Sequence, residues 1–370
     1  MKILTTTPVA ATTGSQQTPP RSGASALVET LVHLGVDKVF GYPGGAVLPI
    51  YDALYNEKRL HHILVRHEQA AVHAAEGYAR STGKPGVVVV TSGPGMSNTT
   101  TGLLDAMSDS IPIICISGQV AKPLIGTQAF QECDAIGIAK TVTKWQTQIQ
   151  DVREVVQRTE EAYNRAVSGR PSPVLIDFPK DIQAQLIDSP IGVSLRKTPK
   201  DSAPSEYDIS QAINLILEAK KPIIYGGGGL INSGNLACDT FAKLVSMTKA
   251  PCTLTLMGLG AFPGSHPQFI GMPGMHGTLE ANLALHDSDL IVCVGARFDD
   301  RVTGDVETFA PNSKKIHIDI DPNSINRLVP VDVGLVGDCG DVLSKIVPIL
   351  RAKINTLQDI QPWWAKIHRW

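Results

Sequence analysis

Short apolar runs alternate with amphipathic stretches along most of this chain. Between residue 24 and about residue 180 the apolar runs are rich in valine and isoleucine, and stretches such as VLPIYDALY and EQAAVHAAEGYARSTG separate them. The separating stretches place apolar side chains at helical spacing, which predicts helices. Runs that are apolar at every position are typical of strands buried on both faces of a parallel sheet. The predicted strands of this part are 38–42, 61–67, 86–93, 111–119 and 173–179.

A second set of the same kind follows farther along the chain. Its predicted strands are 222–229, 251–258, 290–298, 314–321 and 333–338. Between the two sets, IDSPIGVSLRKTPKDSAPSE is rich in proline, serine and lysine and has no period, which indicates a linker. The pattern predicts an α/β chain with two doubly wound parallel-sheet domains. We expect a disordered tail at 1–22, a first domain at 23–186, the linker at 187–206 and a second domain at 207–355.

Composition and charge narrow the classes of partner. The 370 residues include 33 Lys and Arg and 35 Asp and Glu, which gives a net charge of −2, and no basic run stands out. A nucleic-acid partner is therefore not expected. No run approaches the ~18 apolar residues that a membrane span needs. The N-terminal segment lacks the sustained apolar stretch of a signal peptide, so we expect a soluble, cytoplasmic protein.

The cysteines do not suggest a metal or redox site. The chain has six, and their spacing matches neither a CxxC pair nor a zinc cluster. Cys115 and Cys293 lie inside the apolar runs IICIS and LIVCVG. We expect them to be small buried side chains in a reducing compartment.

Two glycine-rich turns follow strands of the first domain. In GYPGGAVLP, residues 41–49, the glycines allow close approach of a ligand, and Pro43 stiffens the turn. In TSGPGMSN, residues 91–98, Gly93 and Gly95 precede a helix N-terminus whose free N–H groups favour polar or anionic ligands. The alternative for each is an ordinary tight strand-to-helix turn.

Amides and acids add further candidates. Gln119, Gln128 and Gln131 fall in one loop, where they would orient a substrate by hydrogen bonding or simply be exposed glutamines. In the second domain, YGGGG resembles a dinucleotide turn without its strict spacing, and IHIDID ends a strand with acids that often bind ribose. GARFDDRVTG adds arginines for phosphates or carboxylates, and the alternative is a surface network of Arg and Asp.

Taken in order, the motifs resemble one family. GYPGGAVLPIYDAL, RHEQAAVHAAEGYAR, TSGPG, GQV…IGTQAFQECD, SGRPSPVLIDFPKDI, LMGLGAFPG, GMPGMHGTLEANLA and GARFDDRVTG match the catalytic subunits of acetolactate synthases, over residues 22–370. The wider group of thiamine-diphosphate-dependent enzymes shares the HE and SGPG elements, and RFDDRVTG with GMHGT narrows the resemblance to acetolactate synthases. Alternatives are another carboligase or oxidase of that group, or a non-catalytic flavin-binding or assembly module.

The resemblance implies a role for Glu68, which stands between the apolar residues ILV and AAV. In this family the glutamate of the HEQ motif hydrogen-bonds a ring nitrogen of the cofactor's aminopyrimidine and so assists removal of a proton from the thiazolium ring. A carboxyl group among apolar residues is desolvated and suited to sharing a proton at neutral pH. The alternative is an ordinary acid in a first helical turn.

The resemblance also implies the other site residues. Glu68, Gln131 and Gly45 would be the catalytic residues, with Pro43, Gly44 and Gly93 shaping the thiamine diphosphate site. Substrate residues would be Phe130, Lys180 and Arg301, and the substrates would be 2-oxo acids. The second domain would hold FAD through Arg170, Gly226, Gly227, Gly228, His276, Gly277, Thr278, Gly295, Ala296, Arg297, Asp319, Ile320 and Asp338.

Two departures from the family are visible. Where many members read QVPTS, this chain reads QVAKP, so Lys122 brings a charge near the substrate channel. The family's Mg²⁺ site, a GDG…N motif in a third domain, has no counterpart: GDV at 304–306 and GDC at 337–339 lack the following Asn. We therefore expect no metal ligands in this chain, a fragment or truncated product that is inactive alone, and residues 356–370 as the start of a connection to the third domain. The family also implies a homodimer or tetramer, a cofactor held between two chains, and a regulatory small subunit.

Overall fold

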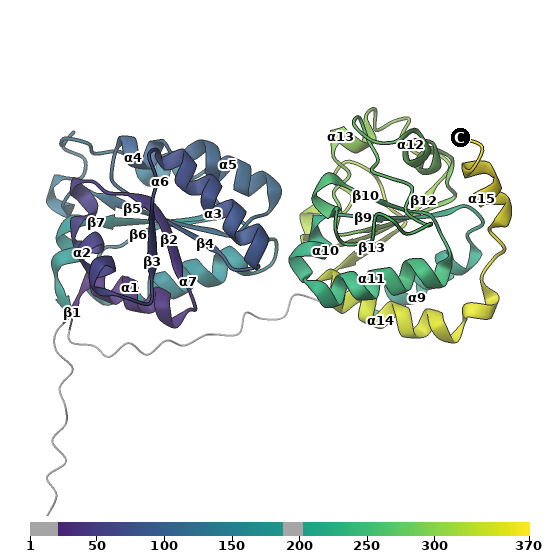
Figure 1. The fold of residues 1–370 in the computed structure, drawn as a ribbon, viewed down its shortest axis with the longest axis horizontal. Helices are drawn as coiled ribbons and strands as arrows, with labels where there is room; N and C mark the ends of the chain where they lie inside the picture. Colours follow the sequence, from purple (N-terminus) through teal and green to yellow (C-terminus); the bar gives the residue numbers. More distant parts are fainter. Residues whose placement is uncertain (1–20, 188–202) are drawn as a thin grey trace, which may run out of the picture.

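The structure is a computed structural model that describes residues 21–187 and 203–370. Its two larger sheets are each wrapped by helices, forming two separate bodies along the chain (Figure 1). The prediction of two doubly wound parallel-sheet domains is therefore confirmed. Most of the predicted tail (1–20) and most of the predicted linker (188–202) lie outside the described residues.

The first sheet has six parallel strands in the order β3-β2-β4-β5-β7-β6. Its strands are β2 (Lys38–Tyr42), β3 (His61–Leu64), β4 (Gly86–Val90), β5 (Ile113–Gln119), β6 (Trp145–Gln148) and β7 (Val174–Pro179). The sequence predicted every one of them except β6, whose residues WQTQ are half-buried and mostly polar. An edge strand of this kind has no continuous apolar run to mark it.

Both faces of this sheet are buried, as the unbroken apolar runs predicted. Along β4, Val87 and Val89 join one core cluster and Val88 and Val90 join the other, because successive side chains point to opposite faces. The first cluster lies under α1 (Gly23–His33), α2 (Leu48–Asn56) and α7 (Val155–Val167), and the second under α3 (Glu68–Thr82), α5 (Thr100–Asp109) and α6 (Ala135–Ala139). Two short helices, α4 (Pro94–Ser97) and α8 (Lys180–Ala184), complete this domain.

A small antiparallel sheet ties together the two ends of the first domain. Its strands are β1 (Arg21–Ser22) and β8 (Leu186–Ile187). Ser22 also caps α1, since its side chain accepts a hydrogen bond from the Ser25 backbone N–H at 3.1 Å. Residues 21–22 and Ile187 are therefore part of the folded domain, although the sequence placed them in the tail and the linker. The pairing spans the whole domain and is only two residues long, so no local pattern announces it.

The second sheet has five parallel strands in the order β10-β9-β11-β12-β13. They are β9 (Pro222–Gly226), β10 (Cys252–Leu254), β11 (Leu290–Val294), β12 (Lys314–Asp319) and β13 (Val333–Val336), all at predicted positions. One face packs on α9 (Glu206–Glu218), α11 (Asn235–Thr248) and α14 (Cys339–Ala352), and the other on α12 (Leu279–Asp287) and α15 (Gln361–Ile367). Short helices α10 (Gly228–Ser233) and α13 (Asp300–Thr303) follow β9 and β11, and 3₁₀ turns occupy Gly45–Val47, Lys122–Leu124, Val152–Glu154, Leu256–Gly258, Pro322–Ser324 and Ile354–Thr356.

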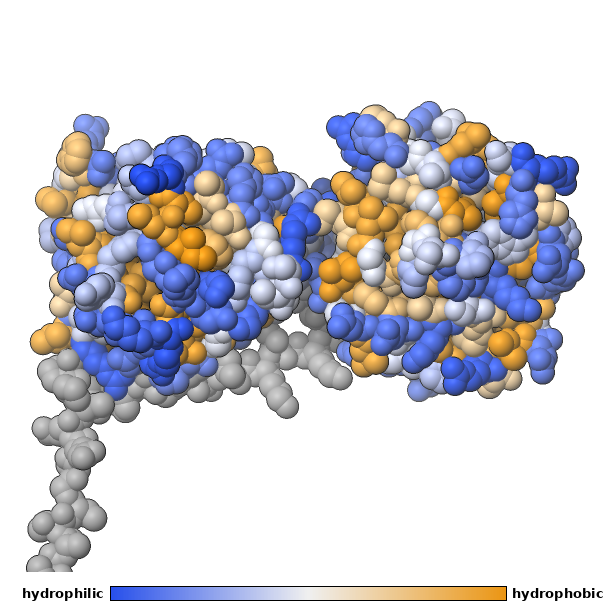
Figure 2. All heavy atoms as spheres, in the orientation of Figure 1, coloured by the Kyte–Doolittle hydropathy of each residue, from blue (hydrophilic) through white to orange (hydrophobic). Residues whose placement is uncertain are grey.

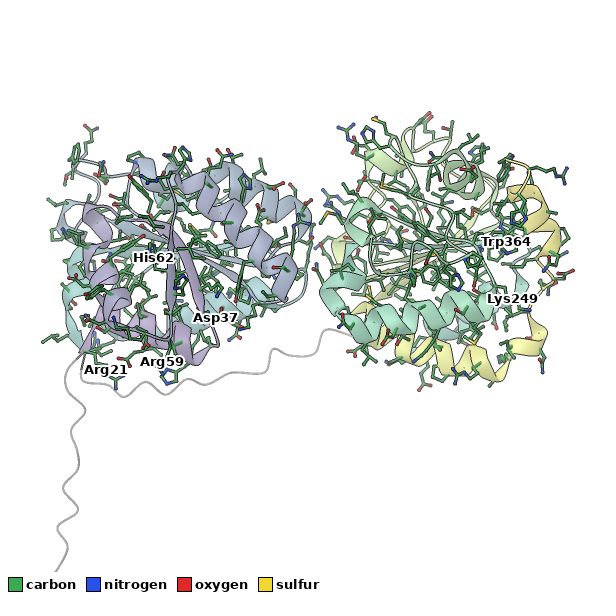
Figure 3. All side chains as sticks on the ribbon, viewed as in Figure 1. Arg21, Asp37, Arg59, His62, Lys249 and Trp364 are labelled. Carbon is green, nitrogen blue, oxygen red and sulfur yellow. The ribbon has the colours of Figure 1, made fainter. Side chains whose placement is uncertain are left out.

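The tryptophan-rich segment at 356–370 packs onto the second domain. Trp363 is 2% exposed and donates from Nε1 to the Pro222 carbonyl at 3.1 Å. Trp364 donates from Nε1 to the Lys249 carbonyl at 2.9 Å, and Figure 3 labels Trp364 and Lys249. A buried indole needs a hydrogen-bond partner, so these two contacts fix α15 in position.

Polar contacts between described residues join the domains. Arg80 Nη1 lies 3.5 Å from Met257 Sδ, and Asn232 donates from Nδ2 to the Ser110 carbonyl at 3.2 Å.

All six cysteines are free, and burial raises the pKa of Cys115 to about 12, which fits the expected inert thiol. Within the described residues, no helix is both long and apolar enough to cross a membrane.

Candidate functional site

The turns after β2, β4 and β5 meet at one edge of the first sheet. Parallel strands present their carboxyl ends at the same edge, which is where ligands bind in such sheets. Thr91 lies at the centre of this meeting point. A Cβ added to Gly44 would lie 2.5 Å from the Thr91 Cβ, and one added to Gly95 would lie 2.7 Å from its Cγ2. Gly44 and Gly95 are therefore required for the turns to pack around Thr91.

The neighbouring turn positions face open space instead. Nothing lies within 4 Å of a Cβ added to Gly45, and both Gly45 and Pro43 are exposed. The Ala46 backbone N–H donates to Thr91 Oγ1 at 3.3 Å, which holds this turn beside the β4 turn. The GYPGG segment thus has one glycine that serves packing and one that leaves room for a ligand.

Glu68 is the first residue of α3 and reaches this edge. It is 8% exposed, and Asn98 donates from Nδ2 to its Oε2 at 3.0 Å. Among the described residues it has no ion-pair partner. Its Oε1 lies 3.6 Å from the position of a Cβ on Gly95, so the carboxyl group lies directly beside the β4 turn. Burial raises the pKa of the Tyr51 hydroxyl well above its usual range. The nearby negative charge of Glu68 raises it further.

Gln131 joins the same edge through its backbone. Both Gly93, at φ +57°, and Gln131, at φ +60°, have left-handed backbone, and a Cβ on Gly93 would lie 2.7 Å from the Gln131 carbonyl oxygen. A glycine is needed at position 93 for this close approach, and the FQE loop is held against the β4 turn as a result.

Gln119 and Gln128, the other two glutamines predicted in this loop, differ in burial. Gln119 is 1% exposed and donates from Nε2 to the Cys133 carbonyl at 2.9 Å and to Asp177 Oδ2 at 3.3 Å. It is therefore a structural residue of the sheet edge, and the prediction that its amide orients a substrate is not supported. Gln128 is exposed, with φ +60°.

The predicted substrate residues fall on two domains. Phe130 is 89% exposed, and Lys180 is exposed at the start of α8. They follow β5 and β7, whose ends pair at Gln119 and Pro179, so both lie at the same sheet edge as Glu68. Arg301 lies on α13 of the second domain. The ammonium group of Lys122 donates to the Gln150 carbonyl at 3.1 Å, which ties its charge to the first domain.

A cavity of about 1070 Å³ lies between the two domains. Most of the residues predicted to hold FAD line it: Arg170, Gly228, His276, Gly295, Ala296, Arg297, Asp319, Ile320 and Asp338. Arg301 lines the same cavity. Its volume slightly exceeds the range of about 300–1,000 Å³ that is typical of ligand and cofactor sites. Residues far apart in the sequence thus line one cavity.

Three charged groups of this cavity, those of Arg170, Asp319 and Asp338, are held by hydrogen bonds. Arg170 donates from Nε to Ser110 Oγ at 2.8 Å, and burial, followed by the nearby charge of Arg297, lowers its pKa. Asp338 caps α14 and accepts at Oδ1 from Ser233 Oγ at 2.6 Å. Asp319 accepts at Oδ1 from the Asp321 backbone N–H at 2.8 Å. Side chains held in this way are preorganised for a ligand.

Several predicted glycines serve chain packing. A Cβ on Gly227 would lie 2.5 Å from the Ala296 Cα, and one on Gly226 would lie 2.7 Å from Leu254 Cδ2. Neither glycine lines the cavity. Gly227 lets the β9 and β11 turns touch, whereas Gly226 makes room for Leu254 of β10.

The GMHGT loop meets the RFDDRVTG segment at the cavity wall. The Met275 backbone N–H donates to the Arg301 carbonyl at 2.8 Å. Gly277 and Thr278 follow the lining residue His276 but do not line the cavity themselves. Thr278 instead caps α12 and donates from Oγ1 to the Ile270 carbonyl at 2.8 Å.

Asn98, Thr91 and Tyr51 also lie at this sheet edge, although the sequence did not predict them as site residues. Asn98 belongs to the TSGPGMSN motif. A buried carboxylate needs a hydrogen-bond donor, but this rule alone does not say which residue donates to Glu68. The donor is 30 positions away in the sequence, so only the fold identifies it.

Both domains match known protein families. Residues 21–138 match the family described as thiamine pyrophosphate enzyme, N-terminal TPP binding domain, and residues 209–346 match thiamine pyrophosphate enzyme, central domain. The acetolactate synthase large subunit of Haemophilus influenzae is 46% identical over 354 residues, which is 94% of this chain and 61% of the relative. The isozyme 3 large subunit of Escherichia coli is 45% identical over 355 residues, 94% of this chain and 62% of the relative.

A relative from Corynebacterium glutamicum, also an acetolactate synthase large subunit, is 47% identical over 356 residues, covering 95% of this chain and 56% of the relative. The chain therefore spans about 60% of the length of the curated relatives that it matches. Both domain matches and these relatives agree with the resemblance found in the motifs. The chain belongs to the thiamine pyrophosphate enzyme family, within which it is similar to acetolactate synthase large subunits.

Proposed function

We propose that this chain supplies the pyrimidine-binding and FAD-binding domains of an acetolactate synthase large subunit, a transferase. The reaction decarboxylates pyruvate on thiamine diphosphate and joins the two-carbon unit to pyruvate or 2-oxobutyrate, in branched-chain amino acid biosynthesis. The observation that carries the proposal is the buried Glu68 carboxyl group, which accepts a hydrogen bond from Asn98 and lies beside the β4 turn.

The residues at the first sheet edge fit the pyrimidine end of thiamine diphosphate. When bound, this cofactor supplies an electron sink for the negative charge left on the keto carbon as carbon dioxide departs. Asn98 donates a hydrogen bond to Oε2 of Glu68 and so orients the carboxyl group. The other oxygen, Oε1, is then available to exchange a proton with a ring nitrogen of the ligand. Gly45 leaves room for the ring, and Gln131 and Phe130 flank the approach of the 2-oxo acid.

The cavity between the domains fits FAD. Arg170, Arg297 and Arg301 provide cationic groups for a diphosphate, and Asp319 at the end of β12 lies where ribose hydroxyls are often bound. The lining includes apolar Met257, Met272 and Met275, which suit a planar ring system. The flavin performs no net redox step in the proposed reaction and serves to hold the two domains together.

The remaining parts of the site would come from outside this chain. In the proposal, Mg²⁺ and its ligands hold the diphosphate of thiamine diphosphate on the part of the large subunit that the relatives have and this chain does not span. Large exposed apolar residues near the site, Tyr42, Leu48, Leu64 and Phe130, suit contact with another chain, and Figure 2 shows apolar patches on this domain. We propose a homodimer or tetramer in the cytoplasm, with a regulatory small subunit as a further partner.

Flavin titration tests the FAD part of the proposal. The full chain should quench FAD fluorescence and bind it in a one-to-one ratio. Arg297→Gln should weaken binding by about tenfold or more, since a hydrogen bond to a charged group contributes about 1.5–3 kcal/mol. Arg153→Gln is the control, because Arg153 is exposed and bonded to Asp151 away from the cavity. Absence of FAD binding by the unaltered chain, or equal weakening in both variants, would remove the flavin site from the proposal.

A further inference from the structure

A second cluster of polar side chains lies on the helices that cover the first sheet. His73 and Glu76 are one turn apart on α3, and Asp105 is on the neighbouring helix α5. His73 Nδ1 lies 2.7 Å from Glu76 Oε2 and 3.8 Å from Asp105 Oδ2. One ligand atom from each residue fits within 4.8 Å of the others. None of the three residues belongs to the cofactor sites described above.

The carboxyl group of Glu76 is incompletely satisfied. Glu76 is 4% exposed, and its Oε1 has no hydrogen-bond partner. A buried carboxylate oxygen without a hydrogen-bond partner is unfavourable, and a bound ligand would satisfy it. Two carboxyl groups therefore flank the His73 imidazole, and one oxygen of the buried Glu76 is left without a hydrogen-bond partner.

We propose that His73, Glu76 and Asp105 bind a divalent transition-metal ion of the Zn²⁺ class. Zn²⁺ accepts one imidazole nitrogen and two carboxylate oxygens at about 2.0–2.2 Å and often keeps a water in the fourth position. Tetrahedral ligands at that radius are roughly 3.3 Å apart, and the observed separations of 2.7 and 3.8 Å fall on either side of this value. Small side-chain rotations suffice, because His73 and Asp105 are exposed.

The tautomer of His73 is compatible with this role. A metal at Nδ1 requires the proton to be on Nε2, and such an N–H is usually held by a second partner. The Gln69 amide lies 3.3 Å from Nε2 and, with its oxygen turned inward, accepts that hydrogen bond. Mg²⁺ fits less well, because it prefers oxygen ligands in an octahedral arrangement.

A metal ion at this cluster would link α3 and α5, the two helices next to the sheet edge where Glu68 lies. Glu68 begins α3, and Asn98 lies just before α5, so these helices carry the two partners of the Glu68–Asn98 hydrogen bond. His73 is five positions after Glu68, about 7.5 Å along the helix axis. The ion would thus stabilise the relative position of α3 and α5 without contacting the cofactor site.

Calorimetric titration of the full chain with ZnCl₂, after removal of metals with a chelator, tests the proposal. We expect one Zn²⁺ per chain at pH 7.5, a higher melting temperature with Zn²⁺, and little or no binding of Mg²⁺. His73→Ala and Asp105→Asn, both at exposed positions, should each weaken Zn²⁺ binding at least tenfold and abolish the thermal shift. His33→Ala is the matched control, because His33 is an exposed histidine on α1 away from the cluster. No binding by the unaltered chain, or binding that His73→Ala leaves unchanged, overturns the proposal.

Discussion

Two adjacent glycines in the GYPGG turn should respond in opposite ways to the same substitution. In Gly44→Ala the new methyl group would lie 2.5–2.7 Å from three atoms of the Thr91 side chain. In Gly45→Ala it would have nothing within 4 Å. The backbone of Gly44 is extended, at φ −169°, so the cost of its substitution is a matter of packing and not of backbone strain.

The expected magnitude follows from the surroundings of Thr91. Thr91 is buried and its Cγ2 also packs against Gly95, so it has little room to move away from a methyl group on residue 44. Inserting a methyl group into a packed site typically costs about 1–3 kcal/mol of unfolding free energy. Gly45→Ala should change the unfolding free energy by less than about 0.5 kcal/mol or raise it slightly, as at other unstrained exposed positions.

Differential scanning calorimetry and cofactor titration would separate the two effects. Gly44→Ala should lower the melting temperature of the first domain, and Thr91→Ala in the same chain should recover part of the loss, because it removes two of the three close atoms. Gly45→Ala should melt like the unaltered chain yet weaken thiamine diphosphate binding in a chain that carries a complete cofactor site. Equal loss of stability in both variants would refute the packing argument, and full cofactor affinity in Gly45→Ala would refute the assigned role of the open space.

Further predictions concern buried groups elsewhere. Burial raises the pKa of Asp177 to about 6 despite hydrogen bonds from Gln148 and Gln119, so the folded state keeps a proton that the unfolded state releases near pH 4. Stability should therefore fall as pH rises from about 4 to 6, by up to about 3 kcal/mol, and Asp177→Asn should remove this dependence; identical pH profiles of urea unfolding in both proteins would contradict it. Gly295→Ala forces a side chain into left-handed backbone at φ +61°, 2.8 Å from Cys339 Sγ, and should destabilise the second domain by at least about 1 kcal/mol and weaken FAD binding. A Gly295→Ala protein that melts and binds FAD normally would show that the β9 and β11 turns need not touch.

The fold was largely predictable because its signals are local. Continuous apolar runs such as GVVVV in β4 mark strands covered on both faces, and helices between them require parallel pairing. The exceptions lacked such a signal. β6 is an edge strand made of WQTQ, and β1 pairs with β8 over two residues at opposite ends of the domain. Their formation depends on neighbours that only the folded chain supplies.

The sequence singled out individual residues of the candidate site but not their contacts. The resemblance named Glu68 and some of the residues that line the cavity. It did not distinguish glycines that pack, such as Gly44 and Gly227, from glycines that leave space, such as Gly45. Gln119 shows the same limit, because a loop position in the sequence became a buried side chain bonded to Asp177. These distinctions depend on distances between segments, which no single stretch of sequence encodes.

The most direct test of the central proposal is acetolactate formation by a fused chain and its Glu68→Gln variant. Residues 1–370 would be joined to the remaining C-terminal part of the Escherichia coli isozyme 3 large subunit and supplied with pyruvate, thiamine diphosphate, Mg²⁺ and FAD. FAD binding by both proteins would confirm that each is folded. The fused chain should form acetolactate, and Glu68→Gln should slow its formation by ~10²–10⁴-fold, the usual contribution of general acid–base assistance. A folded, FAD-bound fused chain that forms no acetolactate, or a Glu68→Gln variant as fast as its parent, would contradict the proposed function.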